Sequence, residues 1–210
     1  MTPDLTITTT HTVAATHSIV GILLAAGVGQ RFDPTAQRFK LTQRLESGET
    51  VITCSARKLR AAVDQMVIVH GPRSVESWAQ TCELDAAQLS CPQAVAGMGA
   101  SLKAAVLAVP PPTTGWLIAL ADMPFIDPLT YQSVVEALHG GAALVRPRYA
   151  NQPGHPVAVH RDKLADLIAL DDATGAQTLF KRYRETICWV PSDDPGCIQD
   201  IDVPTDLIRR

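Results

Sequence analysis

Aromatic residues and long apolar runs are both scarce in this sequence. Phe, Trp and Tyr make up 5% of its 210 residues, which argues against a surface that stacks nucleic-acid bases. No apolar run reaches the roughly 20 residues that a membrane-spanning helix needs. The formal net charge is only −3, so no basic field favours a nucleic acid. We therefore predict neither a nucleic-acid partner nor a membrane partner.

Closely spaced cysteine pairs are also missing. The five cysteines are scattered, and no two have the C-x-x-C spacing of zinc sites and redox pairs. Such a set is typical of a reducing compartment, so we expect a cytoplasmic location. Residues 1–17 contain no Lys or Arg and lack the positive start and apolar core of a secretory signal. We interpret them as a mobile tail that precedes a single domain over residues 18–210.

Short apolar runs alternate with helical patterns along the rest of the chain. This alternation is typical of an α/β protein whose mostly parallel sheet is covered by helices. Strands are expected at 19–24, 65–70, 115–121, 142–146, 157–160 and 187–190. Helices are expected at 53–63, 74–82, 101–109, 127–139 and 164–170, with a final longer helix that ends at Tyr183.

The first apolar run leads directly into a loop of small residues. Two glycines in this loop let backbone N–H groups approach a ligand, and consecutive exposed amides form an anion cradle. Arg31 and Lys40 follow and add two cations. We interpret the stretch as a phosphate-binding loop whose ligand-binding residues include Ala25, Ala26, Gly27 and Gly29.

Two common phosphate loops do not fit this stretch. The dinucleotide fingerprint needs a third glycine three positions after the second, where this chain has Phe32. The other loop ends in Gly-Lys-Ser or Gly-Lys-Thr, which is missing here. An NAD-binding oxidoreductase is therefore disfavoured.

A second glycine-containing loop lies between Ser90 and the helix expected at 101–109. It contains Pro92, Gly97, Met98 and Gly99 and leads to Ser101. Its exposed N–H groups and the serine hydroxyl have two interpretations, a helix cap or a contact with the polar edge of a ligand.

Acidic residues follow the third buried strand and recur near the C-terminus. Asp122 comes at the carboxyl end of a strand, where open α/β sheets bind ligands, and beside a triphosphate it would hold Mg²⁺. The alternative is a cap of the turn before Pro124. Asp200 and Asp202 share a face if they alternate on a strand, so Asp202 would complete the metal site. Its alternative role is an N-cap before a short helix.

Five motifs occur in one order between Ile19 and Leu207. They are Ala-Ala-Gly-x-Gly-x-Arg with the later Lys40, Gly-Met-Gly-x-Ser-Leu, Leu-Ala-Asp-Met-Pro, Gly-His-Pro-Val at His155, and Asp-Ile-Asp-x-Pro-x-Asp-Leu. As a set they resemble the MobA-like nucleotidyltransferase superfamily, and most of all its molybdenum cofactor (molybdopterin) cytidylyltransferases.

This resemblance implies a three-layer α/β/α, Rossmann-like fold and a reaction. CMP would pass from CTP to the terminal phosphate of molybdopterin or molybdenum cofactor, and pyrophosphate would leave. The loop from Ala26 to Gly29, with Arg31 and Lys40, would hold the triphosphate. The implied metal is Mg²⁺ on Asp122 and Asp202, and the implied further partner is a molybdoenzyme or its chaperone. The second loop would lie near the nucleotide base, and His155 near the acceptor.

The sequence departs from the family pattern after Phe32. Asp33 and Pro34 replace the usual glycine, and the interval before Lys40 is longer than usual. Arg38 therefore competes with Lys40 for the lysine's role. The apolar Leu41 anchors Lys40 to the core, which favours Lys40 as the positioned cation.

Two other functions stay open. One is a related transferase that uses GTP or another phosphorylated acceptor, such as a sugar phosphate. Ala25-Ala26-Gly27 favours CTP, since guanylyl relatives tend to have Ala-Gly-Gly there. The other is a non-catalytic chaperone that holds the cofactor for a partner enzyme, against which Asp122 and Lys40 argue.

Overall fold

The computed structural model describes residues 18–208 except positions 28, 30, 36, 73, 74 and 113. The expected mobile tail, residues 1–17, lies outside the described residues. Within the part of the chain that is described, no helix is long and apolar enough to cross a membrane.

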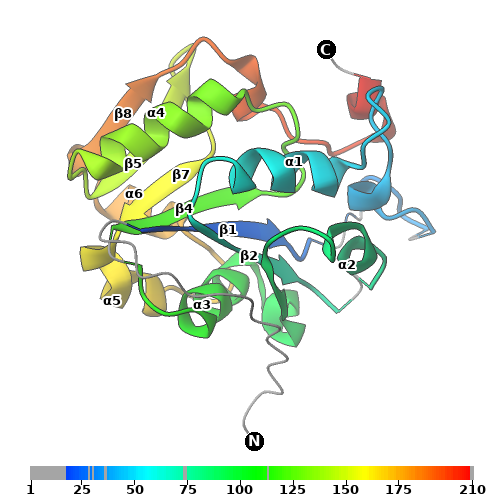
Figure 1. Cartoon of the computed structure of the whole chain (residues 1–210), viewed down its shortest axis with the longest axis horizontal. Helices are drawn as coiled ribbons and strands as arrows, with labels where there is room; N and C mark the ends of the chain where they lie inside the picture. Colours follow the sequence, from blue (N-terminus) through cyan, green and yellow to red (C-terminus); the bar gives the residue numbers. More distant parts are fainter. Residues whose placement is uncertain are drawn as a thin grey trace, which may run out of the picture.

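An eight-stranded mixed sheet forms the centre of the molecule (Figure 1). Its order is β3-β2-β1-β4-β7-β5-β6, and β8 pairs with β5. The first four strands in this order are parallel, β7 is antiparallel to both β4 and β5, and β8 is parallel to β5. The strands are β1 (Ile19–Ala25), β2 (Gln65–His70), β3 (Ala87–Ser90), β4 (Gly115–Leu120), β5 (Leu144–Tyr149), β6 (Gln152–Pro153), β7 (Val157–His160) and β8 (Ile187–Pro191).

Helices cover both faces of this sheet. Figure 1 shows α1 and α4 on one face and α3 and α5 on the other, which gives the expected three layers. The α-helices are α1 (Val51–Arg60), α2 (Val75–Thr81), α3 (Met98–Ala108), α4 (Pro128–His139), α5 (Leu164–Ile168) and α6 (Gln177–Arg182). The 3₁₀ turns are η1 (Lys40–Thr42), η2 (Pro92–Ala96), η3 (Arg161–Lys163), η4 (Arg184–Thr186), η5 (Pro195–Ile198) and η6 (Pro204–Ile208).

Strand β1 divides the core because its side chains alternate between the two faces. Ile19 and Leu23 pack into the cluster beneath α1 and α4, whereas Val20 and Ile22 pack into the cluster beneath α3. All of β1 is buried, as the continuous apolar run predicts for a central parallel strand. The carboxyl ends of β1 and β4 consequently lie side by side, with Leu24 opposite Leu120.

Sequence reasoning gave the fold class correctly and several local features wrongly. It missed β3, a short strand with few apolar residues. Helix α3 begins at Met98 with Gly97 as its N-cap, so Ser101 lies inside the helix rather than capping it. The last long helix is shorter than expected, since α6 has only six residues.

Asp200 and Asp202 do not lie on a strand. The intervening Ile201 donates its backbone N–H to the Asp122 carbonyl at 2.9 Å, and the Asp202 N–H is accepted by the Asp206 carboxylate at 2.9 Å. The segment therefore docks on the loop after β4 instead of joining the sheet.

Candidate active site

The loop after β1 presents backbone amides beside the carboxyl end of the sheet. Gly27 is exposed, and Gly29 has a φ of +65°, a conformation that favours glycine. The Gly29 carbonyl accepts hydrogen bonds from the N–H groups of Phe32 and Asp33 at 3.0 and 3.3 Å, which turns the chain back. In the part of the loop that the structure describes, the amides of Gly27 and Gly29 donate no hydrogen bond to protein and are available to an anion. Val28 lies outside the described residues.

Lys40 is the best-fixed cation near this loop. Its side chain is only 8% exposed, and its Nζ donates to Asp122 Oδ2 at 2.6 Å and to the Ile201 carbonyl at 2.9 Å. The same Nζ lies 3.8 Å from Asp202 Oδ1. One ammonium thus joins two carboxylates from segments 80 residues apart in the numbering, 122 and 202.

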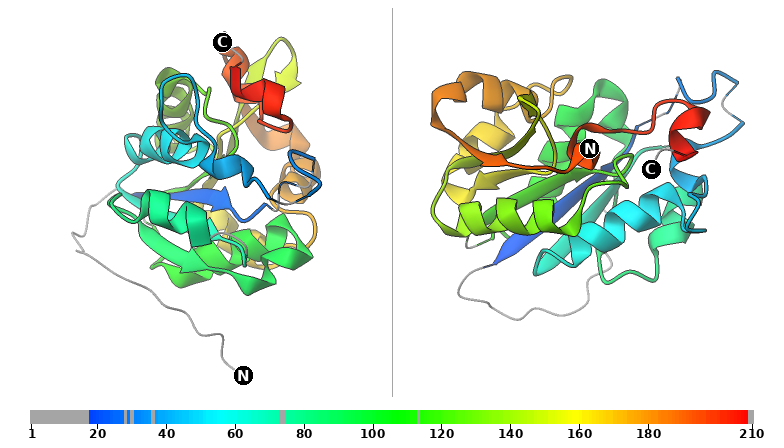
Figure 2. Two further views of the ribbon diagram at one scale, coloured as in Figure 1. Left: turned by 90° about the vertical axis from the view of Figure 1, so that its right-hand side faces the viewer. Right: turned by 90° about the horizontal axis from the view of Figure 1, so that it is seen from above.

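Arg31 completes this charged cluster. Its Nη1 lies 2.5 Å from Asp202 Oδ2, and its side chain is 80% exposed. Figure 2 shows how this is possible: the segment that follows β1, in blue, and the C-terminal segment, in red, lie at the same end of the molecule. The structure therefore brings together four of the residues singled out from the sequence: Arg31, Lys40, Asp122 and Asp202.

The chemistry of this donor set fits a hard divalent cation. Mg²⁺ and Mn²⁺ favour oxygen ligands, and Mg²⁺ in nucleotide enzymes uses one or two carboxylates together with phosphate oxygens. Asp122 and Asp202 supply two such carboxylates. Burial, followed by the nearby carboxylates of Asp202 and Asp122, raises the pKa of Asp200, which marks a local excess of negative charge. Over the described ranges, no group of three or more His, Cys, Asp or Glu residues is placed to hold a metal ion.

Arg38 lies near Asp33 rather than near the carboxylate pair. The Asp33 carboxylate, 7% exposed, accepts hydrogen bonds from the Thr35 N–H and hydroxyl and from the Arg38 N–H. These bonds, first of all that of the Thr35 hydroxyl, lower the pKa of Asp33 to about 2. The Arg38 side chain is 57% exposed and its Nε lies 3.7 Å from the same carboxylate. Asp33 therefore keeps Arg38 on its own side of the segment, whereas Lys40 reaches the carboxylate pair.

Gly97 and Gly99 have a packing role that the sequence did not reveal. A Cβ on Gly99 would lie 1.9 Å from the Asp171 carbonyl oxygen, and one on Gly97 would lie 2.6 Å from the Ala173 Cα. Both glycines therefore allow segment 171–175 to pack closely on the start of α3. Pro92 is exposed in η2, whereas Ser101 is 2% exposed, so its hydroxyl lies below the surface of this loop.

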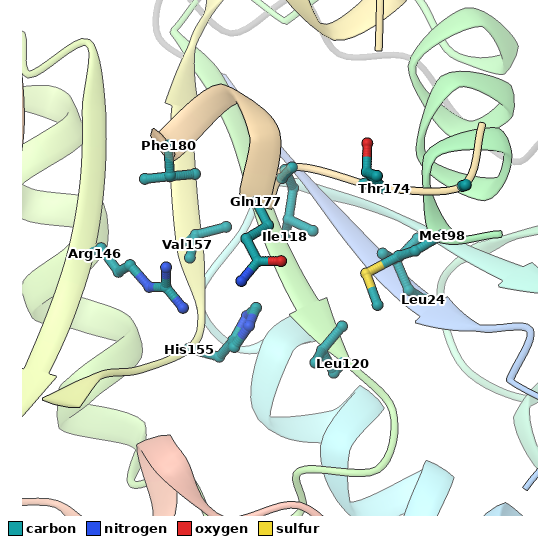
Figure 3. Close-up of a pocket in the computed structure, with 13 residues that line it drawn as sticks. Leu24, Met98, Ile118, Leu120, Arg146, His155, Val157, Thr174, Gln177 and Phe180 are labelled. Carbon is teal, nitrogen blue, oxygen red and sulfur yellow. The ribbon is translucent and has the colours of Figure 1, made fainter. Parts of the chain in front are cut away.

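A mostly apolar cavity of about 250 Å³ lies over β4 and β7 (Figure 3). Leu24 and Leu120, which precede the phosphate loop and Asp122, form part of its wall. The cavity therefore adjoins the charged cluster. Its other lining residues are Met98, Ile118, Arg146, His155, Val157, Ala173, Thr174, Gly175, Ala176, Gln177 and Phe180.

His155 lies in this cavity as a neutral side chain. Burial and, to a lesser extent, the charge of Arg146 lower its pKa to about 4. Its Nδ1 is buried and has no hydrogen-bond partner among the described residues, while its backbone N–H donates to the Cys197 carbonyl at 2.7 Å. No hydrogen bond or ion pair in the described part of the chain links His155 to Lys40 or Asp122.

Sequence reasoning missed Arg146 and Gln177, whose side chains lie in the same cavity close to His155 (Figure 3). Arg146 Nε donates to the Gly154 carbonyl at 2.9 Å, and burial lowers the pKa of the guanidinium. A charged residue within the apolar start of β5 was the available signal, because an arginine is seldom buried without a partner.

Solved structures of other proteins have the same fold. Rv0371c from Mycobacterium tuberculosis H37Rv is 24% identical with a TM-score of 0.78, over 91% of this chain and 96% of that chain. A structure of Rv0371c in complex with manganese is 25% identical with a TM-score of 0.71, over 90% and 95% of the two chains. A nucleotidyl transferase from Methanothermobacter, Mth528, is 24% identical with a TM-score of 0.75, over 90% and 94%.

A search of curated proteins found no match. The sequence itself matches the MobA-like NTP transferase domain over residues 21–187, which includes the phosphate loop, Lys40, Asp122 and the whole cavity. The chain therefore belongs to the MobA-like NTP transferase family, and its activity is nucleotidyl transfer from a nucleoside triphosphate.

Proposed function

We propose that this protein transfers CMP from CTP to the terminal phosphate of molybdopterin or molybdenum cofactor, with release of pyrophosphate. The observation that carries the proposal is the position of Lys40 between Asp122 and Asp202, next to open loop amides. Cations, amides and paired carboxylates at one sheet edge are what a triphosphate and its metal require. The choice of CTP as the nucleotide and of molybdopterin as the acceptor rests on the five motifs, which resemble those of molybdenum cofactor cytidylyltransferases.

The residues of the chain would act mainly by positioning and charge neutralisation. A terminal phosphate oxygen of the acceptor attacks the α-phosphorus of CTP, and the bond to the bridging oxygen of the leaving pyrophosphate breaks. The amides of Gly27 and Gly29, with Arg31 and Lys40, hold the β- and γ-phosphates and stabilise the charge that builds up on the leaving group. Holding both substrates in line removes much of the entropic cost of their encounter.

Asp122 and Asp202 are the residues that would hold Mg²⁺. When bound, the ion would neutralise charge on the phosphate under attack. The manganese complex of Rv0371c supports a divalent ion in this fold at 25% identity. Arg31 and Lys40 would then leave their ion pairs with the two aspartates and contact the phosphates instead, while the aspartates would hold the ion.

We assign the cavity over β4 and β7 to the organic part of the acceptor. Its volume of about 250 Å³ suits a compact ring system, and its walls are mostly apolar. Because the pKa of His155 is about 4, this residue would act near neutral pH as a hydrogen-bonding group rather than as a cation. The positive charge of the cavity comes from Arg146.

The nucleotide base is assigned to the loop from Pro92 to Ser101. The exposed Pro92 and the turn at Gly97 lie on its surface, whereas the buried Ser101 would act through the local backbone. Backbone groups that packing holds in one position discriminate between bases by leaving the groups of a wrong base unpaired.

Pyrophosphate release with each of the four nucleoside triphosphates, with and without molybdenum cofactor, tests the proposal. We expect release only with CTP and cofactor together. Equal turnover of GTP would place the protein with the guanylyl transferases. Tight cofactor binding without pyrophosphate release would instead identify a chaperone. If the protein is the cytidylyltransferase, its product would be passed to a molybdoenzyme or to the chaperone of that enzyme.

A further inference from the structure

Helix α1 directs several polar side chains at the loop that carries Asp122. The Ser55 hydroxyl donates to the Ala121 carbonyl at 2.9 Å. Lys58 Nζ donates to the carbonyls of Pro124 at 2.6 Å and of Ile126 at 2.8 Å. Positions 55 and 58 are three residues apart and thus share one face of the helix.

These bonds hold the backbone on both sides of the carboxylate. Ala121 directly precedes Asp122, and Pro124 and Ile126 follow it. The carbonyl of Asp122 itself accepts from the Ile201 N–H at 2.9 Å. The backbone around Asp122 is therefore fixed from two directions, by α1 and by the C-terminal segment.

Both hydrogen bonds that the Lys58 ammonium forms among the described residues go to backbone carbonyls of one loop. Lys58 is half-buried, and none of the ion pairs among the described residues includes it. A lysine that only needed to be tolerated on the surface would not be directed at two carbonyls of one loop. Helix α1 is itself fixed in the core, because Ile52, Ala56 and Leu59 are fully buried, so its side chains can hold the loop in place.

We propose that Lys58, assisted by Ser55, is a positioning residue that holds the Asp122 carboxylate in the orientation that a divalent metal needs. The proposal rests on the proposed role of Asp122 as a metal ligand. Residues that orient a ligand from behind commonly alter metal affinity by about tenfold or more when removed. Among the described residues, Lys58 forms no hydrogen bond or ion pair with Asp122 itself, so it would act through the loop backbone.

The same helix supplies a matched control. Arg60 also donates to backbone carbonyls, with Nη1 2.9 Å from the Val63 oxygen and Nε 2.9 Å from the Asp85 oxygen. These carbonyls lie away from the loop after β4. Lys58→Met and Arg60→Met each remove one cation and two carbonyl contacts from the same helix, and they differ in which loop is released. Arg60→Met also removes the ion pair with the Asp85 carboxylate, so it is the more severe of the two changes at the helix itself.

Mn²⁺ binding to the full chain in the presence of CTP, measured by electron paramagnetic resonance without acceptor, is the test. We expect Lys58→Met to weaken Mn²⁺ binding by about tenfold, Lys58→Arg to restore most of it, and Arg60→Met to stay within about twofold of the wild type, well below that effect. Thermal denaturation of each variant measures the loss of stability separately.

Equal Mn²⁺ binding by Lys58→Met and wild type would overturn the positioning role, as would an equal loss in Arg60→Met. If the Lys58→Met chain does not fold, Ser55→Ala decides the question, since unchanged Mn²⁺ binding there would also overturn it. Asp122→Asn separates the two proposals. If wild type binds Mn²⁺ with CTP and Asp122→Asn does not, the metal site stands whatever the result at Lys58. If wild type binds none, the metal assignment and the positioning role fall together.

Discussion

The two halves of the site differ in how they are built. The charged half, around Lys40 and Asp122, consists of ion pairs between loops at the ends of β1 and β4. The cavity half, around His155 and Arg146, consists of apolar side chains with a few polar groups of altered pKa. The first arrangement suits chemistry shared by a whole family. The second suits the choice of one acceptor, because apolar shape and buried polar groups set specificity.

The largest effect should come from the charged half. Asp122→Asn keeps the shape of the side chain and removes its charge. We expect turnover with Mg²⁺ to fall by about a hundredfold or more, since electrostatic stabilisation supplies much of the rate enhancement in this chemistry. Steady-state pyrophosphate release measures it, and circular dichroism should show an unchanged fold. Near-normal turnover in this variant would show that Asp122 is not a metal ligand of the reaction.

The next effect separates two cations of one segment. Lys40→Ala should lower kcat/KM for CTP at least about tenfold more than Arg38→Ala, or about 1.4 kcal/mol of transition-state stabilisation. The reason is that Lys40 reaches both carboxylates, whereas Arg38 reaches Asp33. A greater loss in Arg38→Ala would mean that the lysine's role has moved along this longer segment.

A third effect belongs to the cavity half. Arg146→Met should raise KM for the acceptor by about tenfold, because the substitution removes one hydrogen bond to a charged group. KM for CTP should stay unchanged. Arg148→Met is the control on the same strand, because the Arg148 guanidinium lies 3.8 Å from the centre of the Trp189 ring and outside this cavity. A change in KM for CTP with Arg146→Met would show that the two halves are not divided as we propose.

The smallest effect concerns pH. The pKa of His155 is about 4 in the folded chain against an ordinary value of 6.5, so the unfolded chain binds the proton more readily. This group therefore favours folding above pH 6.5, and its contribution is lost as pH falls from 6.5 towards about 4. Urea denaturation at several pH values should show a shallower loss in His155→Gln than in wild type. His160→Gln is the control, because His160 lies beside Asp162 and outside the cavity, and it should leave the loss of stability between pH 6.5 and 4 as steep as in wild type.

Sequence reasoning succeeded where a motif is local. Apart from β3 and β6, the order of strands and helices follows from short stretches with one physical meaning, and so do the loop after β1 and the position of Asp122 at the end of β4. It failed where a residue's role depends on a distant segment. Gly99 must be small because the Asp171 carbonyl packs against it, a contact across more than 70 positions that no local pattern reveals.

The choice between Lys40 and Arg38 shows the same limit. Leu41 predicted that this end of the segment is anchored to the core, and its side chain is 2% exposed. However, Arg38 stays away from the Asp122 and Asp202 carboxylates because the buried Asp33 carboxylate accepts a hydrogen bond from its backbone N–H and lies near its guanidinium. A buried aspartate that accepts several hydrogen bonds cannot be told from a solvated one by its sequence.

The packing of segment 171–175 on the start of α3 has a consequence for how this enzyme could diverge. Ala173 and Gly175 line the cavity over β4 and β7 that we assign to the acceptor, and the same segment packs against Gly97 and Gly99 in the loop that we assign to the base. On this assignment a substitution that enlarges either glycine would displace a wall of the cavity as well. A change of nucleotide and a change of acceptor would then be inherited together, so new specificities in such a lineage should arise in pairs.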